Sequence, residues 1–284
     1  LTPGHPEFGH TPGVETTTGP LGQGVATAVG MAMAARFERG LFDPDSPDRP
    51  FDYRVWVIAS DGDLEEGISA EASSLAGRQQ LANLCVLWDD NRISIEGDTA
   101  LAFDEDVVAR YRSYGWDVHE VDMLDNGDVD IASVDAALRA SAACTTAPSF
   151  IRVRTTIAWP APHARGTSKS HGSALGHDEV AATKSELGLD PSQDFAFDES
   201  LLERIRSDRA TRGAAHRAIW AMAIDAWRAS HPERAALLDR LTAHDLPADT
   251  EAALPSYESG TAVATRKASG DTISALAAVL PELW

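Results

Sequence analysis

Two polar clusters in the sequence could together hold a divalent metal ion. Asp61-Gly62 and Asp90-Asn91 each follow closely on an apolar run. A carboxylate and an amide are hard oxygen ligands that suit Mg²⁺ or Ca²⁺, and Mg²⁺ often completes its shell with water and substrate phosphates. Gly62 would let the backbone approach a ligand closely, and a helix beginning near Leu64 would offer N–H groups to an anion. Asp61 and Asn91 could instead be simple capping and turn residues, and the residues alone leave both interpretations open.

Alternating strands and helices would bring these two clusters together. The apolar runs at 53–59 and 84–88 are typical of strands buried on both faces of a parallel sheet. Repeated βα units predict an α/β fold, with a parallel sheet and helices on both faces. Ligands of such sheets bind outside the carboxyl ends of the strands, where Asp61 and Asn91 fall. The other predicted elements here are a helix opened by Gly19-Pro20 and ending at Gly40, helices at 65–80, 105–114 and 131–142, and strands at 116–121 and 149–155.

The rest of the chain predicts a long loop and a helical extension. Residues 155–176 are rich in Gly, Ser, His and Pro, and loops of this length in a compact domain usually serve a function. Helix is predicted from 177 to 242, then a linker over 246–262 and a new helix over 265–280. Because the chain begins at Leu1 and ends at Trp284 directly after an apolar stretch, we expect both ends to be cut from a longer protein. The predicted division is an α/β domain over 1–190, incomplete at its N-terminus, a helical connector over 191–260, and the start of another domain over 261–284.

Composition narrows the class of partner. The 284 residues include 44 acidic and 24 basic side chains, for a formal net charge of −20. This field repels nucleic acid and anionic membranes, and the basic residues form no patch that would offset it. No apolar run approaches the length of a membrane span, and the polar first residues do not resemble a signal peptide. We expect no nucleic-acid or membrane partner, and free thiols at Cys85 and Cys144 in a reducing cytoplasm.

The spacing of the two polar clusters resembles the thiamine diphosphate-binding motif. In that motif Gly-Asp-Gly is followed, after a spacer, by an Asn. Here the spacer between Gly62 and Asp90 runs over residues 63–89, which is 27 residues. The sequence departs from the motif at Ser60, which replaces the opening Gly and would be less comfortable in a left-handed conformation. Asp63, next to the expected phosphate site, is electrostatically awkward and has no assigned role.

Six blocks of sequence narrow the resemblance to the transketolase family. They occur in the family's order with compatible spacing and extend over nearly the whole chain, most weakly at 190–260. Six blocks in order are far more specific than any one motif. The blocks are TPGHPE (2–7), GVETTTGPLGQG (13–24), EGISAEASSLAG (66–77), DDNRISI (89–95), SHGSALG (170–176) and ATRKAS (264–269).

The resemblance implies roles at the cofactor site. Asp61 and Asn91 resemble the side-chain ligands of the metal, Mg²⁺ or Ca²⁺, and Ile93 resembles the residue that adds a backbone carbonyl. Gly62 would lie against the diphosphate. The other residues that resemble cofactor contacts are Gly19 and Leu21 at the aminopyrimidine, and Glu66, Asn91 and His171.

The resemblance also implies substrate and interface residues. His5 and His171 resemble catalytic histidines of the substrate channel, and neutral imidazoles suit that task because they donate and accept protons near neutrality. Arg266 resembles an arginine that grips the phosphate of a sugar phosphate. Glu66 and Glu71 resemble acids at the interface of the family's homodimer, although such a pair on a helix could equally face solvent. His10, His163 and His177 have no assigned role.

The implied activity is the transfer of a two-carbon ketol unit from a ketose phosphate to an aldose phosphate, in the pentose phosphate pathway of the cytoplasm. In this family the Glu that protonates the aminopyrimidine lies in a following domain and comes from the other subunit. The chain stops before that domain and lacks the family's N-terminal stretch with two more histidines. We therefore expect residues 1–284 alone to be inactive and to bind the cofactor weakly.

Other functions are less consistent with the motifs. Arg266 within ATRKAS favours transketolase over dihydroxyacetone synthase, and the TPGHPE and SHGSALG blocks disfavour deoxyxylulose phosphate synthase. A degenerate, non-catalytic metal- or nucleotide-binding module would predict damaged ligands, whereas Asp61, Asn91, His5 and His171 are all present. The sequence contains no dinucleotide fingerprint, no GxxxxGK[ST] phosphate loop and no GxSxG elbow.

Overall fold

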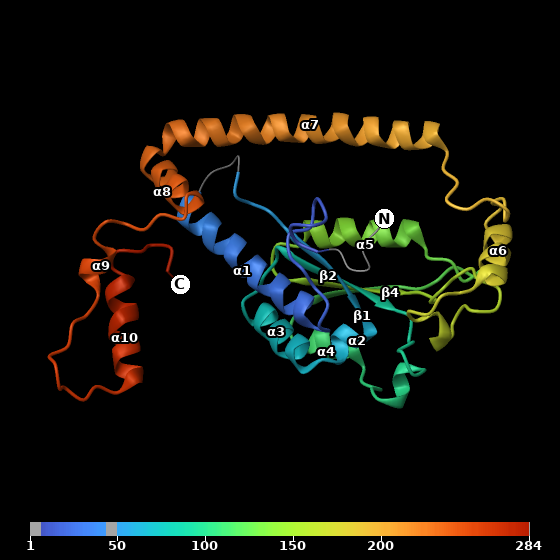
Figure 1. Ribbon diagram of the computed structural model, residues 1–284, viewed down its shortest axis with the longest axis horizontal. Helices are drawn as coiled ribbons and strands as arrows, with labels where there is room; N and C mark the ends of the chain where they lie inside the picture. Colours follow the sequence, from blue (N-terminus) through green and yellow to red (C-terminus); the bar gives the residue numbers. More distant parts are fainter. Residues whose placement is uncertain (1–6, 44–49, 284) are drawn as a thin grey trace. The chain divides into compact units, whose positions relative to one another are not determined.

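The computed structural model describes residues 7–43 and 50–283. The chain divides into two compact units, the first made of Leu1–Phe37 with Asp52–Arg204 and the second of Glu38–Phe51 with Ile205–Trp284. The first unit carries the sheet, and the second is helical (Figure 1). The functional division predicted at residues 190 and 260 stays a prediction.

Four parallel strands form the sheet of the first unit. Its strand order is β1-β2-β4-β3, so the two strands that precede the polar clusters are neighbours. Ser60, the last residue of β1, pairs in register with Asp89 of β2, and the carboxyl ends of the two strands therefore meet at one edge. The predicted parallel α/β sheet is confirmed. The strands are β1 (Val55–Ser60), β2 (Leu84–Asp90), β3 (Asp117–Val121) and β4 (Ser149–Arg154).

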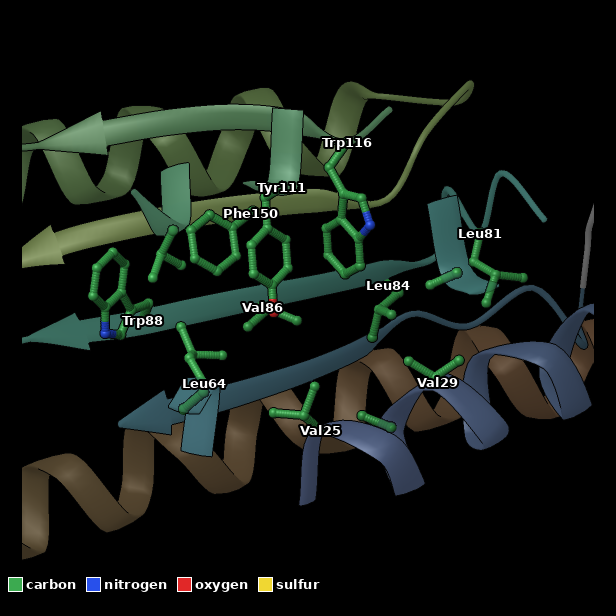
Figure 2. Close-up of a cluster of buried hydrophobic side chains, with 14 of the residues drawn as sticks. Val25, Val29, Leu64, Leu81, Leu84, Val86, Trp88, Tyr111, Trp116 and Phe150 are labelled. Atoms are coloured by element: carbon green, nitrogen blue, oxygen red, sulfur yellow. The ribbon is translucent and has the colours of Figure 1, made fainter. Parts of the chain in front are cut away.

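One face of the sheet is covered by α1 (Gln23–Phe42), α3 (Gly67–Arg78) and α4 (Val107–Ser113). Side chains alternate between faces along a strand, so Trp88 of β2 and Phe150 of β4 enter the same core (Figure 2). Tyr111 stacks on Phe150 with ring centroids 3.8 Å apart. The buried Tyr111 hydroxyl is hydrogen-bonded to Ser73 over 3.0 Å, which removes the cost of an unpaired polar group. This packing stabilises the part of the sheet that precedes the carboxyl ends of β1 and β2, where the polar clusters lie.

The opposite face is covered by α5 (Ile131–Ala143). The alternate residues of the strands, Cys85 and Ile151 among them, pack there with Ala137 of the helix. Helices therefore lie on both faces, as predicted. Cys85 is a free, buried thiol whose burial raises its pKa to about 11, and Cys144 is also free.

The structure corrects the start of the first predicted helix and adds a short helix near the polar clusters. The first helix begins at Gln23 rather than at Gly19-Pro20, because Gly22 has a φ of +76° that an α-helix cannot contain. The helix predicted over 65–80 is confirmed as α3, and a short helix, α2 (Asp61–Glu65), precedes it. They are separated at Glu66, whose ψ of 136° is extended. A Cβ added to Gly22 would lie 2.9 Å from Glu66 Cβ and 2.9 Å from Ser69 Oγ, so close packing of Gly22 coincides with this break.

The helix predicted over 177–242 is also interrupted. Gly188 has a φ of +69°, and Asp190 Oδ1 accepts a hydrogen bond from Ser192 N across Pro191, which forms a turn. The observed helices are α6 (His177–Glu186), α7 (Glu199–Ser230) and α8 (Pro232–Thr242).

The second unit has a small core of its own. Trp227 of α7 packs edge-on against Phe42 and donates its Nε1 to the Phe42 carbonyl over 3.0 Å. Arg240 of α8 forms a two-pronged ion pair with Glu282, with both N–O distances 2.8 Å. Two further helices complete the unit, α9 (Thr250–Ala253) and α10 (Thr265–Leu276). Within the described residues, no helix is both long and apolar enough to cross a bilayer.

Candidate functional site

The carboxylate of Asp61 joins the ends of β1 and β2. Asp61 is the first residue of α2, directly after β1, and its residue is 7% exposed. Its Oδ2 accepts hydrogen bonds from Asn91 N over 3.3 Å and from Arg92 N over 3.0 Å, and its Oδ1 accepts one from Trp88 Nε1 over 3.2 Å. The two predicted ligand residues, Asp61 and Asn91, are therefore brought to the same edge of the sheet.

Asn91 begins a tight turn after β2. Its Oδ1 accepts a hydrogen bond from Ile93 N over 2.9 Å, and Arg92 between them has a φ of +61°. Ile93 then forms an isolated antiparallel bridge with Asp98. The turn thus holds Asn91 and Ile93, the second and third predicted metal contacts, within one hydrogen-bonded loop. A side-chain oxygen accepting from a backbone N–H keeps further lone pairs for a cation.

Electrostatics at this edge favour a bound cation. Burial, followed by the nearby charge of Asp90, raises the pKa of Asp61 to about 6. Asp90 is 2% exposed, and its carboxylate pairs with Arg154 over 2.9 Å. Two neighbouring acids in a buried setting are costly to ionise unless positive charge compensates them. Arg92 and Arg152 also lie 3.7 Å and 3.8 Å from the Asp90 carboxylate. By contrast, among the described residues Asp61 has N–H donors and no ion pair, which leaves room for a cation beside it.

The residues present fit a metal that is shared with a phosphate group. Among the described residues, no group of three or more His, Cys, Asp or Glu side chains is arranged to hold a metal ion. One carboxylate, one amide and a backbone carbonyl leave several positions of an octahedral Mg²⁺ for water and diphosphate oxygens. A cavity of about 470 Å³ opens beside this edge, and its lining includes Asp61, Trp88, Asp90 and Arg92.

A loop from the start of the chain lies against the same edge. A Cβ added to Gly62 would lie 3.2 Å from Leu21 Cδ1, so the Leu21 side chain rests on the Gly62 backbone. The side chain of Leu21 is 51% exposed, and the Gly19 residue is exposed. The loop lines a second cavity of about 250 Å³ together with Asp63 and Ile58. The predicted aminopyrimidine contacts thus adjoin the predicted diphosphate contact.

Four more residues shape this edge in ways that sequence reasoning did not predict. Trp88 was not singled out and donates to Asp61, and Asp90, known only as part of a polar cluster, adds to burial in raising the pKa of Asp61. Ser60 is extended, with φ −94° and ψ 174°, so the left-handed conformation that would be uncomfortable for serine does not occur there. Asp63, which had no assigned role, accepts hydrogen bonds from Ser60 and from Gly22.

The predicted substrate residues lie in separate parts of the chain. His5 lies outside the described residues. His171 is exposed at the end of a short 3₁₀ turn, η2 (Ser168–Ser170), in the long loop. Arg266 is exposed on α10 of the second unit. Their roles stay predictions.

The long loop that carries His171 is fastened by Glu179 of α6. The Glu179 carboxylate accepts hydrogen bonds from His163 N, His163 Nδ1 and Ala164 N, each over 2.8 Å. These bonds lower the pKa of Glu179, with the His163 backbone bond as the first cause. His163, unassigned from the sequence, therefore has a structural partner.

The predicted interface acids lie on an exposed part of α3. Glu66 and Glu71 are both exposed. Ile68 and Leu75 of the same helix are 47% and 43% exposed, and with Glu71 they fall at the i, i+3 and i+7 spacing of one helix face. This exposed face of α3 therefore carries both acidic and apolar side chains.

Comparisons with known proteins agree with this geometry. The family described as "Transketolase, thiamine diphosphate binding domain" matches residues 1–247. The transketolase of Mycobacterium tuberculosis is 55% identical over 286 residues, which cover all of this chain and 40% of that protein. The transketolase of Geobacillus stearothermophilus is 42% identical over 283 residues, with all of this chain and 42% of that protein covered. The chain thus spans about 40% of the length of these curated relatives.

Solved structures show the same fold. The transketolase of Pichia stipitis, crystallised in complex with sedoheptulose-7-phosphate, superposes with a TM-score of 0.88 at 39% identity. The match covers 99% of this chain and 41% of that one. The transketolase of Leishmania mexicana gives a TM-score of 0.88 at 37% identity over the same shares of the two chains.

Proposed function

The chain belongs to the transketolase family through its thiamine diphosphate-binding domain, and we propose that it holds the diphosphate end of the cofactor through a divalent metal at the β1–β2 edge. The observation that carries the proposal is the joining of the two strand ends at Asp61, whose carboxylate is hydrogen-bonded to the backbone of Asn91 and Arg92. Asp61, the Asn91 side chain and the Ile93 carbonyl would hold the metal, Mg²⁺ or Ca²⁺.

The chemistry of the donor set supports a metal bound through the diphosphate. Among the described residues Asp61 is buried and forms no ion pair, whereas its neighbour Asp90 pairs with Arg154. A divalent cation would supply a compensating charge and keep Asp61 ionised. Gly62, without a side chain, would let the diphosphate approach the start of α2. Leu21 and Gly19 would contact the aminopyrimidine, with Glu66 and His171 as further cofactor contacts.

The proposed activity of the complete protein is ketol transfer between sugar phosphates, as in the pentose phosphate pathway of the cytoplasm. When bound, thiamine diphosphate supplies the nucleophilic carbon that cleaves and rebuilds the carbon–carbon bond. The structure of the Pichia stipitis relative was determined with sedoheptulose-7-phosphate, which supports a sugar phosphate substrate here. His5 and His171 would donate and accept protons at the reacting hydroxyls, and Arg266 would bind the substrate phosphate.

We further propose that the complete protein is a homodimer whose interface includes Glu66 and Glu71. The exposed Ile68 and Leu75 beside these acids support a partner surface on α3. Residues 1–284 alone would be inactive, because the relatives that they match are more than twice as long.

A binding experiment tests the proposal. The full-length natural protein is stripped of metal with a chelator and titrated with thiamine diphosphate by calorimetry, with and without Mg²⁺. We expect binding only with Mg²⁺, and a loss of that binding in Asp61→Ala. Equal binding with and without the metal, or in the variant, would contradict the proposed site. A parallel ketol-transfer assay compares the full-length protein with residues 1–284, and turnover by the shorter chain would contradict its proposed inactivity.

A further inference from the structure

Asp63 is the feature of the motif that the proposed cofactor site leaves without a role. It follows Gly62 directly, so its negative charge lies close to where a diphosphate would bind. A free carboxylate there would repel the ligand. The structure shows that this carboxylate is not free, because three donors surround it.

Both oxygens of the Asp63 carboxylate are hydrogen-bonded. Oδ2 accepts from Ser60 N over 2.8 Å and from Ser60 Oγ over 2.9 Å. Oδ1 accepts from Gly22 N over 2.9 Å, across 41 residues of sequence. The first two bonds form a capping box at the start of α2, and the third reaches out of the helix to the N-terminal loop.

Gly22 is held in place from the other side as well. Its residue is buried, and its φ of +76° is a backbone conformation that favours glycine. A Cβ on Gly22 would lie 2.9 Å from Glu66 Cβ, from Ile68 Cγ2 and from Ser69 Oγ, so its backbone is in direct contact with the start of α3. Ser69 Oγ in turn donates to the Asp63 carbonyl. Gly22 is therefore fixed between Asp63 and α3.

We propose that Ser60 and Asp63 form a latch that fixes Gly22 and thereby positions Leu21 over Gly62 for the cofactor. The latch joins the two sides of the site: Gly22 directly follows Leu21, and Asp63 directly follows Gly62. Its loss would free the loop at 19–22 and leave the proposed aminopyrimidine and diphosphate contacts misaligned. The inference rests on the proposed cofactor site.

The latch also explains why serine can stand at position 60. Ser60 is extended, so a left-handed glycine is not required there. The hydroxyl supplies one of the three donors that compensate the charge of Asp63, and it also accepts from Asp63 N over 3.4 Å. Ser60 and Asp63 therefore act together, and neither belongs to the proposed metal ligands. Both are positioning residues.

The test compares Asp63→Ala with Asp130→Ala in the full-length protein. Asp130 is a matched control, because it also caps a helix through a serine, accepting from Ser133 N over 3.1 Å and from Ser133 Oγ over 2.6 Å, and it has no bond to the loop at 19–22. Without cofactor, both variants should lower the melting temperature, and Asp63→Ala should lower it further because it also leaves Gly22 N without its acceptor. With Mg²⁺ and thiamine diphosphate, only Asp63→Ala should bind roughly tenfold or more weakly, and its ligand-induced rise in melting temperature should shrink accordingly.

Two further measurements separate positioning from folding. In the metal-free protein, amide hydrogen exchange over residues 19–24 should accelerate in Asp63→Ala and stay at the wild-type rate in Asp130→Ala. Ser60→Gly, which removes one of the three donors to Asp63 and keeps the N–H groups of residues 60 and 22, should weaken cofactor binding, but less than Asp63→Ala does. Asp63→Asn, which offers one acceptor and one donor, should fall between wild type and Asp63→Ala and serves if the alanine variant does not fold.

The possible results distinguish failure of the latch from failure of the proposed function. Wild-type affinity in Asp63→Ala, or equal weakening in Asp130→Ala, would overturn the latch. Unchanged exchange over residues 19–24 in Asp63→Ala would also overturn it. Failure of the wild-type protein to bind thiamine diphosphate with Mg²⁺ would instead overturn the proposed function.

Discussion

The two ends of the proposed site are built differently. At the β1–β2 edge, Asp61 is buried and accepts three hydrogen bonds, and Asp63 accepts three more. In the long loop, His171 is exposed, and within the described residues its side chain makes no hydrogen bond. The protein's own hydrogen bonds therefore fix the acids of the edge, whereas no such bonds fix the side chain of His171 in the part of the chain that the structure describes. We expect the conformation of the cofactor end at the β1–β2 edge to change little when a ligand binds, and that of the loop end around His171 to adapt to it.

Removal of the buried carboxylate should have the largest effect. We expect Asp61→Ala to weaken Mg²⁺-dependent binding of thiamine diphosphate by at least about 100-fold, because it deletes a proposed metal ligand and the side chain that hydrogen-bonds from the end of β1 to the end of β2. Calorimetric titration of the full-length protein measures the change. His171→Ala is the comparison at the adaptable end and should weaken cofactor binding less. The reverse order would contradict the difference between the two ends.

Substitution of the buried glycine tests how tightly the edge is packed. Gly22→Ala places a Cβ 2.9 Å from three atoms at a φ of +76°. We expect it to lower the free energy of unfolding by about 2–4 kcal/mol, through backbone strain and overpacking. Gly9→Ala is a control with a φ of +79° and open space around its Cβ, so it carries the strain alone. Chemical denaturation measures the free energy of unfolding of both variants. An equal decrease in the two would show that the packing around Gly22 is not tight.

The acidity of the edge predicts a pH dependence of binding. Because the pKa of Asp61 is raised to about 6 in the metal-free protein, a proton competes with the metal below that pH. Metal-dependent cofactor affinity should fall by up to about tenfold for each pH unit below 6. The stability of the metal-free protein changes with pH in the opposite direction. Since the folded pKa lies above the ordinary 3.8, the metal-free protein should lose stability as the pH rises from about 4 to 6. Asp61→Asn removes the ionisable carboxylate. If the stability of this variant still fell between pH 4 and 6 as in wild type, another group would be responsible for the pH dependence.

The smallest effect is expected where Glu179 is hydrogen-bonded to His163 and Ala164 of the long loop, a set of contacts that we call the clasp. Glu179→Gln keeps an oxygen that can accept one backbone N–H but removes the charge that draws three donors together. We expect faster amide exchange at residues 163–171 and a rise in the KM for sugar phosphate of less than about tenfold, with cofactor affinity unchanged. Because the pKa of Glu179 is lowered, the clasp is present near neutral pH and is lost as the pH falls through that lowered value. A loss of cofactor affinity as large as that of Asp61→Ala would contradict the division between the two ends.

The sequence predicts local features well and contacts across the chain poorly. The apolar runs ending near Asp61 and Asn91 predict neighbouring strands, and the structure pairs them in register. The break at Glu66 and the late start of α1 depend on Gly22, which meets α3 across more than 40 residues, and no local pattern reports such a contact. The interruption near Gly188 and Pro191 carried a local signal, but the helix over 177–242 was predicted from a composition rich in Ala, Arg and Glu.

The functional side chains also divide into those that a local pattern predicts and those that depend on contacts across the chain. Asp61, Asn91 and Gly62 could be proposed from their positions at strand ends, because parallel strands direct their carboxyl ends to one edge. Asp63 could not, because its role depends on a hydrogen bond to Gly22. Asp90 could not be distinguished from a metal ligand until Arg154 was found beside it.

Locating the metal itself tests the central claim most directly. Crystals of the full-length protein grown with Mn²⁺ and thiamine diphosphate would give an anomalous signal at the metal. We predict one peak at the β1–β2 edge, about 2 Å from an Asp61 carboxylate oxygen and from Asn91 Oδ1, with the Ile93 carbonyl also in contact. A peak away from Asp61, or a bound diphosphate with no metal between it and the strand ends, would contradict the proposed site.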